Sequence, residues 1–180
     1  MCMVYYFTPF YKGDLGKAYN HYCELVPNDD DWITFSDGDV LQLHLDWGDI
    51  WGKILEENDS AGIVTCLTNR IGSKEQLYDG SYLAKDILTH KKIANNLLKL
   101  NNIRTKNISS AISGFFFSFK KSTWTKVGGF KKGILGVDRD FAKKVHEANL
   151  SIKIAYGFYV FHYYRFLESP EKGNYTGHLI

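Results

Sequence analysis

Short apolar stretches alternate along the chain with segments whose apolar residues recur at helical spacing. Stretches of the first kind, rich in β-branched and aromatic residues, predict strands at 4–10, 32–36, 62–67, 112–119 and 151–161. Segments of the second kind predict helices at 15–26, 50–57, 90–100, 121–127 and 138–149. Because helices and strands alternate, we expect an α/β protein whose central sheet is mostly parallel.

Turn and loop signals divide this pattern. Asp14 is placed to cap the helix at 15–26, and Pro27 ends it. The stretch 72–86 is polar with Gly and Ser, which predicts a mobile loop. The polar residues at 169–180 predict a loosely attached tail. With 180 residues the chain is long enough for one domain, expected at 1–168, and too short for two of ordinary size.

Charge and composition narrow the classes of partner. The net charge is +2, from 22 basic and 20 acidic residues, which argues against nucleic acid or a membrane surface as the main partner. Apolar residues make up 44% of the chain, so it can bury a core, yet no apolar run is long enough to cross a bilayer. Three widely separated cysteines follow no metal-binding spacing, which predicts free thiols and a cytoplasmic protein.

An acidic turn follows the predicted strand at 32–36. Asp37 and Asp39 flank Gly38 there, and the carboxyl-end rule for open α/β sheets brings this turn beside residues 8–10. Two carboxylates offer the oxygen ligands that Mg²⁺ and Mn²⁺ prefer, and such a cation neutralises a diphosphate leaving group. Asp-Gly-Asp is also common in ordinary turns, and that alternative stays open.

The segment before this turn resembles the GT-A glycosyltransferases, especially family 2. It reads Gly-Lys-Ala-Tyr-Asn at 16–20, then the apolar strand at 32–36, then Asp-Gly-Asp. The resemblance implies a GT-A-like three-layer sandwich that uses Mn²⁺ or Mg²⁺. It also implies that Asp37 contacts the ribose or sugar of the donor and that Asp39, with Asp37, holds the cation.

A second stretch resembles the same family. It consists of Gly-Gly-Phe at 128–130 and Gly-Val-Asp-Arg-Asp-Phe at 136–141. By resemblance Asp138 is the catalytic base, since a carboxylate within reach of an acceptor hydroxyl can take its proton. Val137 stands where the family usually has glutamate, so one supporting acid is absent. Alternatively, Asp138 and Asp140 only cap a helix and interact with its dipole.

The resemblance assigns further positions. His162, which ends the last predicted strand, completes the metal site or contacts the diphosphate; a hydrogen-bonded structural histidine is the alternative. Arg165 pairs with phosphate. Gly114 lets the sugar and acceptor approach the backbone. The residues expected to bind the donor are Thr8, Pro9, Phe10, Lys17, Asn20, Asp37 and Gly114.

One departure from the family pattern concerns the nucleotide-binding half. Family members normally place two more strands and a helix, with an acidic cluster that recognises base and ribose, before the Gly-x-Ala-x-Asn helix. Here residues 11–14 bridge that gap directly. Three explanations stay open: a minimal enzyme, a nucleotide held mainly by Thr8, Phe10 and Lys17, or a partner subunit that completes the site.

The expected activity is therefore metal-dependent hexose transfer from a nucleotide-diphosphate sugar, with UDP favoured, to a hydroxyl of a glycan, a lipid-linked acceptor or a protein. Asp138 as base fits inversion at the anomeric carbon, and retention and homo-oligomerisation are left open. One alternative is a module of the same fold that binds nucleotide sugars without turnover. Another is a nucleotidyltransferase, although no Gly-rich phosphate loop with a basic residue follows the first strand.

Overall fold

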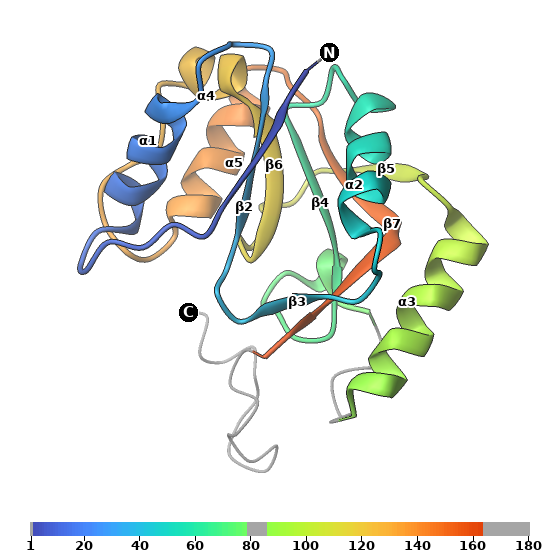
Figure 1. The fold of residues 1–180 in the computed structure, drawn as a ribbon. Coiled ribbons are helices and arrows are strands. Elements are labelled where there is room, and N and C mark those ends of the chain that lie inside the picture. Colours follow the sequence, from blue (N-terminus) through green and yellow to red (C-terminus); the bar gives the residue numbers. More distant parts are fainter. Residues whose placement is uncertain (1, 79–85, 164–180) are drawn as a thin grey trace.

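Strands and helices alternate along most of the structure, a computed structural model that describes residues 2–78 and 86–163 (Figure 1). In chain order the elements are β1 (Val4–Phe7), α1 (Leu15–Leu25), β2 (Trp32–Ser36), β3 (Val40–Gln42), α2 (Trp47–Glu56), β4 (Ile63–Thr68), the 3-10 helix η1 (Lys74–Gln76), α3 (Ile87–Asn101), β5 (Thr105–Ile108), β6 (Phe116–Lys120), α4 (Lys121–Val127), α5 (Val137–Glu147) and β7 (Ile152–His162). The α/β class is confirmed. The strand at 32–36 and the helix at 121–127 have the predicted bounds, and the other predicted elements are present with shifted ends.

The described strands form one mixed sheet in the order β1-β2-β6-β4-β7-β3, with β5 also paired to β7. Only β1 with β2 and β4 with β7 are parallel pairs; β6, β3 and β5 run antiparallel to their neighbours. The expectation of a mostly parallel sheet is therefore wrong, because hydrophobic periodicity reports which side chains are buried and not the direction of a strand. The strands β1, β2, β4 and β7 still point the same way, so their carboxyl ends share the edge where β6 begins.

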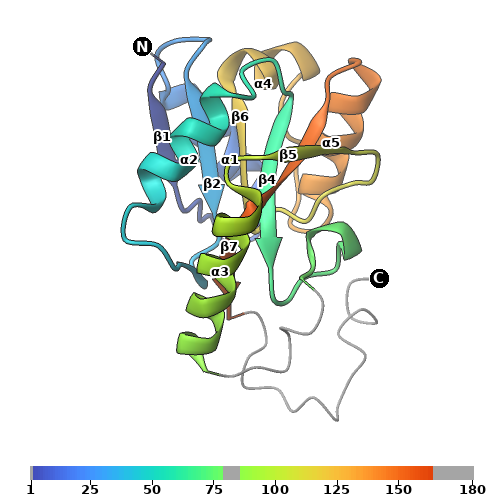
Figure 2. The same ribbon diagram turned by 90° about the vertical axis from the view of Figure 1, so that its right-hand side faces the viewer.

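Helices cover both faces of this sheet. Helices α1 and α5 lie on one face and α2 on the other, as two perpendicular views show (Figures 1 and 2). Aromatic rings fill the first interface, where Phe35 lies 4.5 Å from Tyr19 between ring centroids. On the second face Trp51 of α2 packs 4.9 Å from Phe116. These two apolar layers cover the faces of the sheet, so polar functional side chains are expected at the ends of the strands.

The structure contains two short strands, β3 and β5, that the sequence analysis does not predict. Strand β3 has three half-buried or exposed residues, and β5 carries exposed Lys106 and Asn107 at the sheet edge. Neither contains the apolar run that predicts a strand. The consequence is largest for β3, because it carries the chain from the end of β2 to the far side of the sheet, where Val40 pairs with His162 of β7.

Some expectations lie partly or wholly outside the described residues. Of the predicted loop at 72–86, residues 72–78 contain η1 and the buried Gln76, and 79–85 are not described. Arg165 and the predicted tail at 169–180 also lie outside the described residues, so the boundary of the 1–168 domain stays a prediction. None of the helices within 2–78 and 86–163 is long and apolar enough to span a membrane. The three cysteines are free thiols, as expected.

Candidate metal centre and active site

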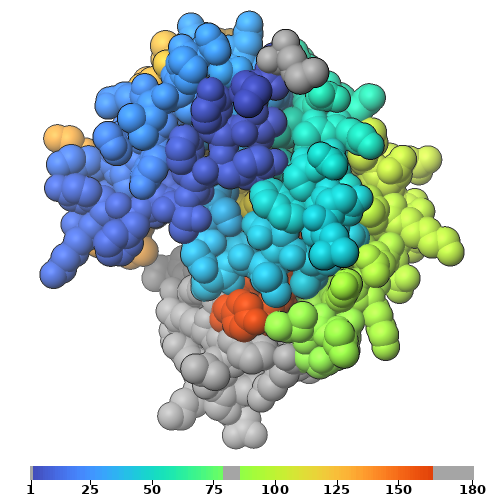
Figure 3. Space-filling model, in the orientation of Figure 1, coloured from blue at the N-terminus to red at the C-terminus, as the bar shows by residue number. Residues whose placement is uncertain are grey.

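Three side chains meet at the edge where the parallel strands end. Nε2 of His162 lies 3.2 Å from Oδ1 of Asp39 and 4.0 Å from Oδ2 of Asp37. One ligand atom from each residue lies within 4.8 Å of the other two. The imidazole is 2% exposed and each carboxylate 46% exposed, so the cluster is supported from inside and open to solvent. The end of β7 reaches the surface beside the segment that contains β3 (Figure 3).

The acidic turn lies across the end of the sheet and is held at both of its ends. The N–H of Asp37 donates to the carbonyl of Phe115, just before β6, over 2.8 Å. The N–H of Tyr163 donates to the carbonyl of Asp39 over 2.9 Å. Because β3 pairs with the last residues of β7, Asp39 is placed against His162. The unpredicted strand therefore assembles the cluster.

Buried neighbours fix the orientation of His162. The imidazole Nδ1 lies 2.9 Å from the carbonyl oxygen of Arg70. Since a carbonyl only accepts, Nδ1 carries a proton and Nε2 faces the carboxylates. The amide of Asn69 accepts from the N–H of His162 over 2.7 Å and donates to its carbonyl over 3.2 Å. The ring of Phe115 stacks on the imidazole with centroids 5.6 Å apart. This support is typical of a metal-ligating histidine.

The carboxyl groups of Asp37 and Asp39 have pKa values shifted in opposite directions. Desolvation by surrounding protein raises the pKa of Asp37 to about 6; His162 opposes this rise, and the charges of Asp39 and Asp138 add to it. The neighbouring imidazole of His162 lowers the pKa of Asp39. Negative charge is therefore least favourable at Asp37 when no cation balances it.

The donor set fits a small divalent cation. With bonds of about 2.1 Å, adjacent ligands of an octahedral ion lie about 3 Å apart and opposite ligands about 4.2 Å apart. The distances of 3.2 and 4.0 Å from Nε2 of His162 fall in this range. An imidazole among two carboxylates suits Mn²⁺ better than Mg²⁺, because Mg²⁺ is bound mainly through oxygen. Three protein ligands leave coordination positions for phosphate oxygens.

Asp138 lies in the first turn of α5, at the same edge of the sheet. Its Oδ2 accepts from the N–H of Gly114 over 2.7 Å, and its Oδ1 accepts from the N–H of Arg139 over 2.9 Å. A Cβ at position 114 would lie 2.9 Å from the Cβ of Asp138, so this approach requires glycine. The negative charge of Asp138 is one of the causes that raise the pKa of Asp37, after desolvation and the charge of Asp39.

A pocket of about 260 Å³ adjoins Asp37 on the face that α2 covers. Thr8 lines it, with its Cγ2 3.6 Å from where a Cβ of Gly38 would be. Its wall includes Tyr6 and Trp47, whose ring centroids lie 4.9 Å apart in an edge-to-face contact. The pocket therefore joins an aromatic wall to the carboxylate cluster.

Five of the predicted donor-binding residues do not line this pocket: Pro9, Phe10, Lys17, Asn20 and Gly114. Phe10 is 82% exposed, and neither it nor Pro9 lines the pocket. The ammonium of Lys17, on the exposed side of α1, donates to the hydroxyl of Tyr11 over 3.0 Å and lies 4.4 Å above its ring. These contacts give Lys17 a local partner away from the cluster.

Asn20 holds the segment after α4 in place. Its amide donates to the carbonyl of Phe130, and its oxygen accepts from the N–H of Phe130 and the indole N–H of Trp124, each over 2.9 Å. With donor and acceptor both engaged, this side chain stabilises the fold. Donor binding by Asn20 stays a prediction beside this structural role.

Sequence reasoning missed Asn69, Arg70 and Trp47. Asn69 and Arg70 follow the buried strand β4 directly and are themselves buried. The carboxyl-end rule that singles out Asp37 also applies to them. Trp47 carries no comparable signal, because a tryptophan that opens a helix is equally typical of a core residue.

Comparisons with known proteins add no assignment. A scan against protein-family models matches no family, and a search of curated proteins finds no match to this chain. Membership of a glycosyltransferase family is therefore not shown, and the functional conclusion depends on the chemistry of the site.

Proposed function

We propose that this protein is a metal-dependent glycosyltransferase that moves a hexose from a nucleotide-diphosphate sugar to an acceptor hydroxyl. The observation that carries the proposal is the cluster of Asp37, Asp39 and His162, whose ligand atoms could hold a cation, together with a further carboxylate, Asp138, whose charge acts on Asp37. A cation site for the leaving diphosphate and a base for the acceptor are the two groups that this reaction requires. The resemblance of both motifs to GT-A enzymes supports the same function and a GT-A-like sandwich.

The cluster would hold Mn²⁺ in preference to Mg²⁺, through Asp37, Asp39 and Nε2 of His162. When bound, the cation neutralises the charge that develops on the leaving diphosphate. Arg70 and Asn69 keep the imidazole directed at the two carboxylates. Because both carboxylates are half-exposed, a diphosphate can reach the cation from solvent.

Asp138 would act as the base. The acceptor oxygen forms a bond to the anomeric carbon while the bond from that carbon to the diphosphate oxygen breaks. The hydroxyl proton passes to a carboxylate oxygen of Asp138, and the nucleoside diphosphate leaves with the bonding electron pair. Each oxygen of Asp138 accepts one backbone hydrogen bond and keeps a lone pair for this proton. Attack opposite the leaving group inverts the anomeric centre.

The pocket beside Asp37 is the natural place for the nucleoside end of the donor. It begins at the proposed cation ligand, and Thr8 and Gln42 supply polar groups along it. The aromatic rings of Trp47 and Tyr6 offer flat apolar surface for a base. A UDP-sugar, with its small pyrimidine, suits a pocket of about 260 Å³.

Release of nucleoside diphosphate from a panel of UDP-, GDP- and dTDP-sugars, with Mn²⁺, Mg²⁺ or chelator, tests the proposal. We expect Mn²⁺-dependent release with one donor. Asp39→Asn should abolish the Mn²⁺-dependent release of nucleoside diphosphate. Asp138→Asn should slow transfer by about 10²–10⁴-fold while leaving Mn²⁺ binding unchanged. Asp30→Asn, in an exposed turn, is the matched control. Full activity of Asp39→Asn would overturn the metal assignment.

One observation favours a second candidate, a module that binds a nucleotide sugar without turnover. Both oxygens of Asp138 accept backbone N–H groups, one from Arg139 in the first turn of α5 and one from Gly114 in the loop before β6, as a purely structural carboxylate would. Calorimetry distinguishes the two functions. Donor binding that needs Mn²⁺, with no product from any donor and acceptor mixture, would favour the module.

A further inference from the structure

Four large apolar side chains are exposed on two loops at the starts of α1 and α5. One loop precedes α1 and the other precedes α5, and we call residues 10–17 and 131–136 the loop pair. Phe10 is 82% exposed and Leu135 is 86% exposed, and Tyr11 and Ile134 are exposed as well. Side chains of this size that gather at the surface commonly mark a site of interaction.

Backbone contacts hold the two loops together. The N–H of Gly16 donates to the carbonyl of Gly133 over 3.1 Å, and the N–H of Gly133 donates to a carboxylate oxygen of Asp14 over 2.9 Å. A Cβ at position 16 would overlap the carbonyl oxygen of Lys131, so this close approach requires glycine. The segment at the start of α1 projects at the left of the molecule in Figure 3. The loop pair is therefore one projecting surface.

The loop pair is also basic. It contains four lysines and one acidic residue, Asp14, whose carboxylate accepts from the N–H groups of Lys17 and Gly133. The lysines are all exposed and are Lys12, Lys17, Lys131 and Lys132. The net charge of +2, which argues against a membrane surface as the main partner, is a sum over the whole chain and does not report this local concentration.

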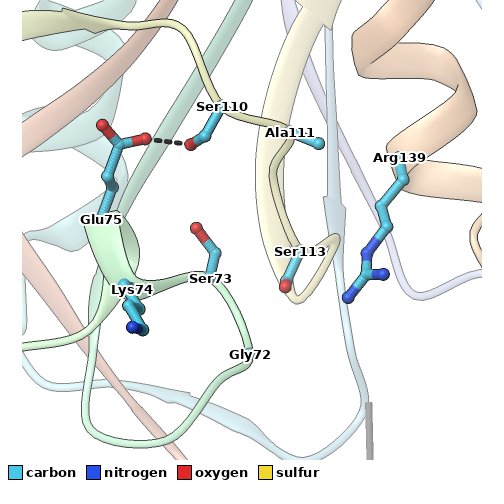
Figure 4. A pocket seen from close by; sticks show the side chains of 8 residues that line it. All are labelled: Gly72, Ser73, Lys74, Glu75, Ser110, Ala111, Ser113 and Arg139. Atoms are coloured by element: carbon cyan, nitrogen blue, oxygen red, sulfur yellow. Dashed lines mark hydrogen bonds between the residues drawn. The ribbon is translucent and has the colours of Figure 1, made fainter. Parts of the chain in front are cut away.

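Arg139 does not add to this charge. It lies in the first turn of α5, and Figure 4 shows its side chain extending toward the hollow between the loop that leads into η1 and the loop before β6. The positive charge of the loop pair therefore comes from lysines, whose ammonium groups are point charges on flexible stems. Such groups suit an array of anionic headgroups better than one ligand that needs fixed two-point pairing.

We propose that the loop pair docks on an anionic lipid membrane surface. Phe10, Ile134 and Leu135 would enter the boundary between headgroups and acyl chains, and the lysines would contact the headgroups. Apolar and basic side chains in combination bind proteins to the surface of a bilayer without spanning it. Because Leu135 lies three positions before Asp138, docking would bring the proposed base near the headgroups. The proposal does not depend on the proposed function.

Exposure and charge together favour a membrane over a protein partner. Phe10 and Leu135 are almost fully exposed, so each projects into solvent with space around it. A folded partner would need a preformed pocket for each side chain, whereas acyl chains close around an inserted side chain of any shape. Each lysine near an anionic membrane surface adds to the affinity. An anionic bilayer therefore matches both properties of the loop pair.

Sedimentation of the full chain with lipid vesicles, without any nucleotide sugar, tests the proposal. One set of vesicles contains phosphatidylcholine alone, and the other contains phosphatidylcholine and phosphatidylglycerol in about a two-to-one ratio. We expect binding to the second set to be at least about tenfold tighter and to weaken as the salt concentration rises. Equal binding to both sets, or binding to neither, would overturn the proposal.

A pair of leucine variants assigns the binding to the loop pair. Leu135→Gln should weaken binding to the anionic vesicles by about tenfold or more, because it removes an apolar side chain that enters the bilayer. Leu100→Gln, at a 75% exposed position of α3, is the matched control and should bind as wild type does. Both side chains are exposed, so the melting temperatures should stay unchanged. Equal effects of the two variants would contradict the proposal.

A pair of charge variants makes the same assignment independently. Lys131→Gln combined with Lys132→Gln should weaken vesicle binding by about tenfold or more. Lys91→Gln combined with Lys92→Gln removes the same charge from two adjacent exposed positions of α3 and should have little effect. If the α3 variant weakens binding as much as the loop-pair variant does, the loop pair is not the docking surface.

A second copy of this chain is the other occupant that an exposed apolar surface of this kind could take. Self-association that Leu135→Gln abolishes, with no binding to vesicles, would assign the loop pair to a dimer and overturn the membrane proposal. Analytical ultracentrifugation over a range of protein concentrations measures it. Vesicle binding without donor turnover would contradict the proposed function alone, and Mn²⁺-dependent turnover without vesicle binding would contradict membrane docking alone.

Discussion

Asp37 and Asp138 are each hydrogen-bonded to one of two consecutive residues in the loop before β6. The N–H of Asp37 donates to the carbonyl of Phe115, and the carboxylate of Asp138 accepts from the N–H of Gly114. The loop before β6 therefore sets the spacing between a proposed cation ligand and the proposed base. A displacement of this loop changes the metal site and the base together.

Gly114→Ala should disturb that spacing. The added Cβ would lie 2.9 Å from the Cβ of Asp138 and 3.2 Å from a ring carbon of Phe117, so one of them must shift. We expect a loss of stability of about 1–3 kcal/mol and a fall in transfer rate of about 100-fold. The control is Gly52→Ala in α2, where nothing lies within 4 Å and stability should rise by about 0.5–1 kcal/mol. Unchanged transfer by Gly114→Ala would contradict the role of the loop.

The stability of the metal-free protein should depend on pH through Asp37. Its pKa in the fold, about 6, lies above the usual 3.8, so the folded state holds this proton more tightly than the unfolded chain does. The stability that the proton confers is present below pH 3.8 and is lost as the pH rises through about 6. Asp37→Asn removes that loss.

Thermal unfolding with chelator measures this effect. Asp37→Asn should melt at a higher temperature than wild type at pH 7, and the difference should vanish near pH 4. With Mn²⁺ the order should reverse at pH 7, because only wild type keeps the full ligand set. A variant that is less stable than wild type at pH 7 without metal would contradict the charge assignment.

Asn69→Leu should separate support of His162 from general packing. The substitution keeps the branched shape of the side chain but removes both hydrogen bonds to the backbone of His162. We expect Mn²⁺ affinity to fall by about 10–100-fold. Asn58→Leu is the matched control, because Asn58 is also buried and hydrogen-bonded, to Ile54. Calorimetry should show destabilisation in both variants and weaker Mn²⁺ binding only in the first.

Trp47→Leu should weaken donor binding and leave Mn²⁺ binding unchanged. Trp47 lines the pocket beside Asp37, whereas no atom of its side chain is a ligand candidate in the cluster. The loss of aromatic surface should cost about tenfold in donor affinity. Titration of Mn²⁺ and of the preferred nucleotide sugar into the same variant checks both expectations, and an unaltered donor affinity would place the nucleoside elsewhere.

Asn20→Ala should act on stability alone. Its amide makes three hydrogen bonds, two to the backbone of Phe130 after α4 and one to the indole N–H of Trp124 within α4. With these removed, the free energy of unfolding should fall by about 1–3 kcal/mol. Donor affinity per folded molecule should stay that of wild type. A specific loss of donor affinity in denaturant-free titrations would restore the donor-binding role that the motif implies.

Much of the fold could be predicted because burial and periodicity coincide. Four of the five residues of β2 are buried, three of them apolar, and the predicted bounds of this strand agree with the structure. Asp14 caps α1 as predicted, with its carboxylate accepting from the N–H of Lys17 over 2.9 Å. The pattern does not indicate strand direction. Strand β6 is as apolar as its neighbours β2 and β4, yet it runs antiparallel to both.

The candidate site could be predicted only in part, for a related reason. Asp37 and Asp39 follow a buried strand, so the rule for strand ends finds them. Their partner His162 is brought close by β3, whose three residues carry no strand signal. For Asn20 the motif does not reveal the tertiary hydrogen bonds to Phe130, which lies 110 positions further along the chain.

The pairing of β3 with β7 has a consequence for how the protein matures. Both carboxylates are synthesised early, but the histidine and the strand edge that orient them belong to the last described element of the chain. Ribosome-bound intermediates that lack β7 would consequently have low affinity for Mn²⁺. On the proposed Mn²⁺ site, uptake of the ion would report that the final strand has docked and would mark the completion of folding.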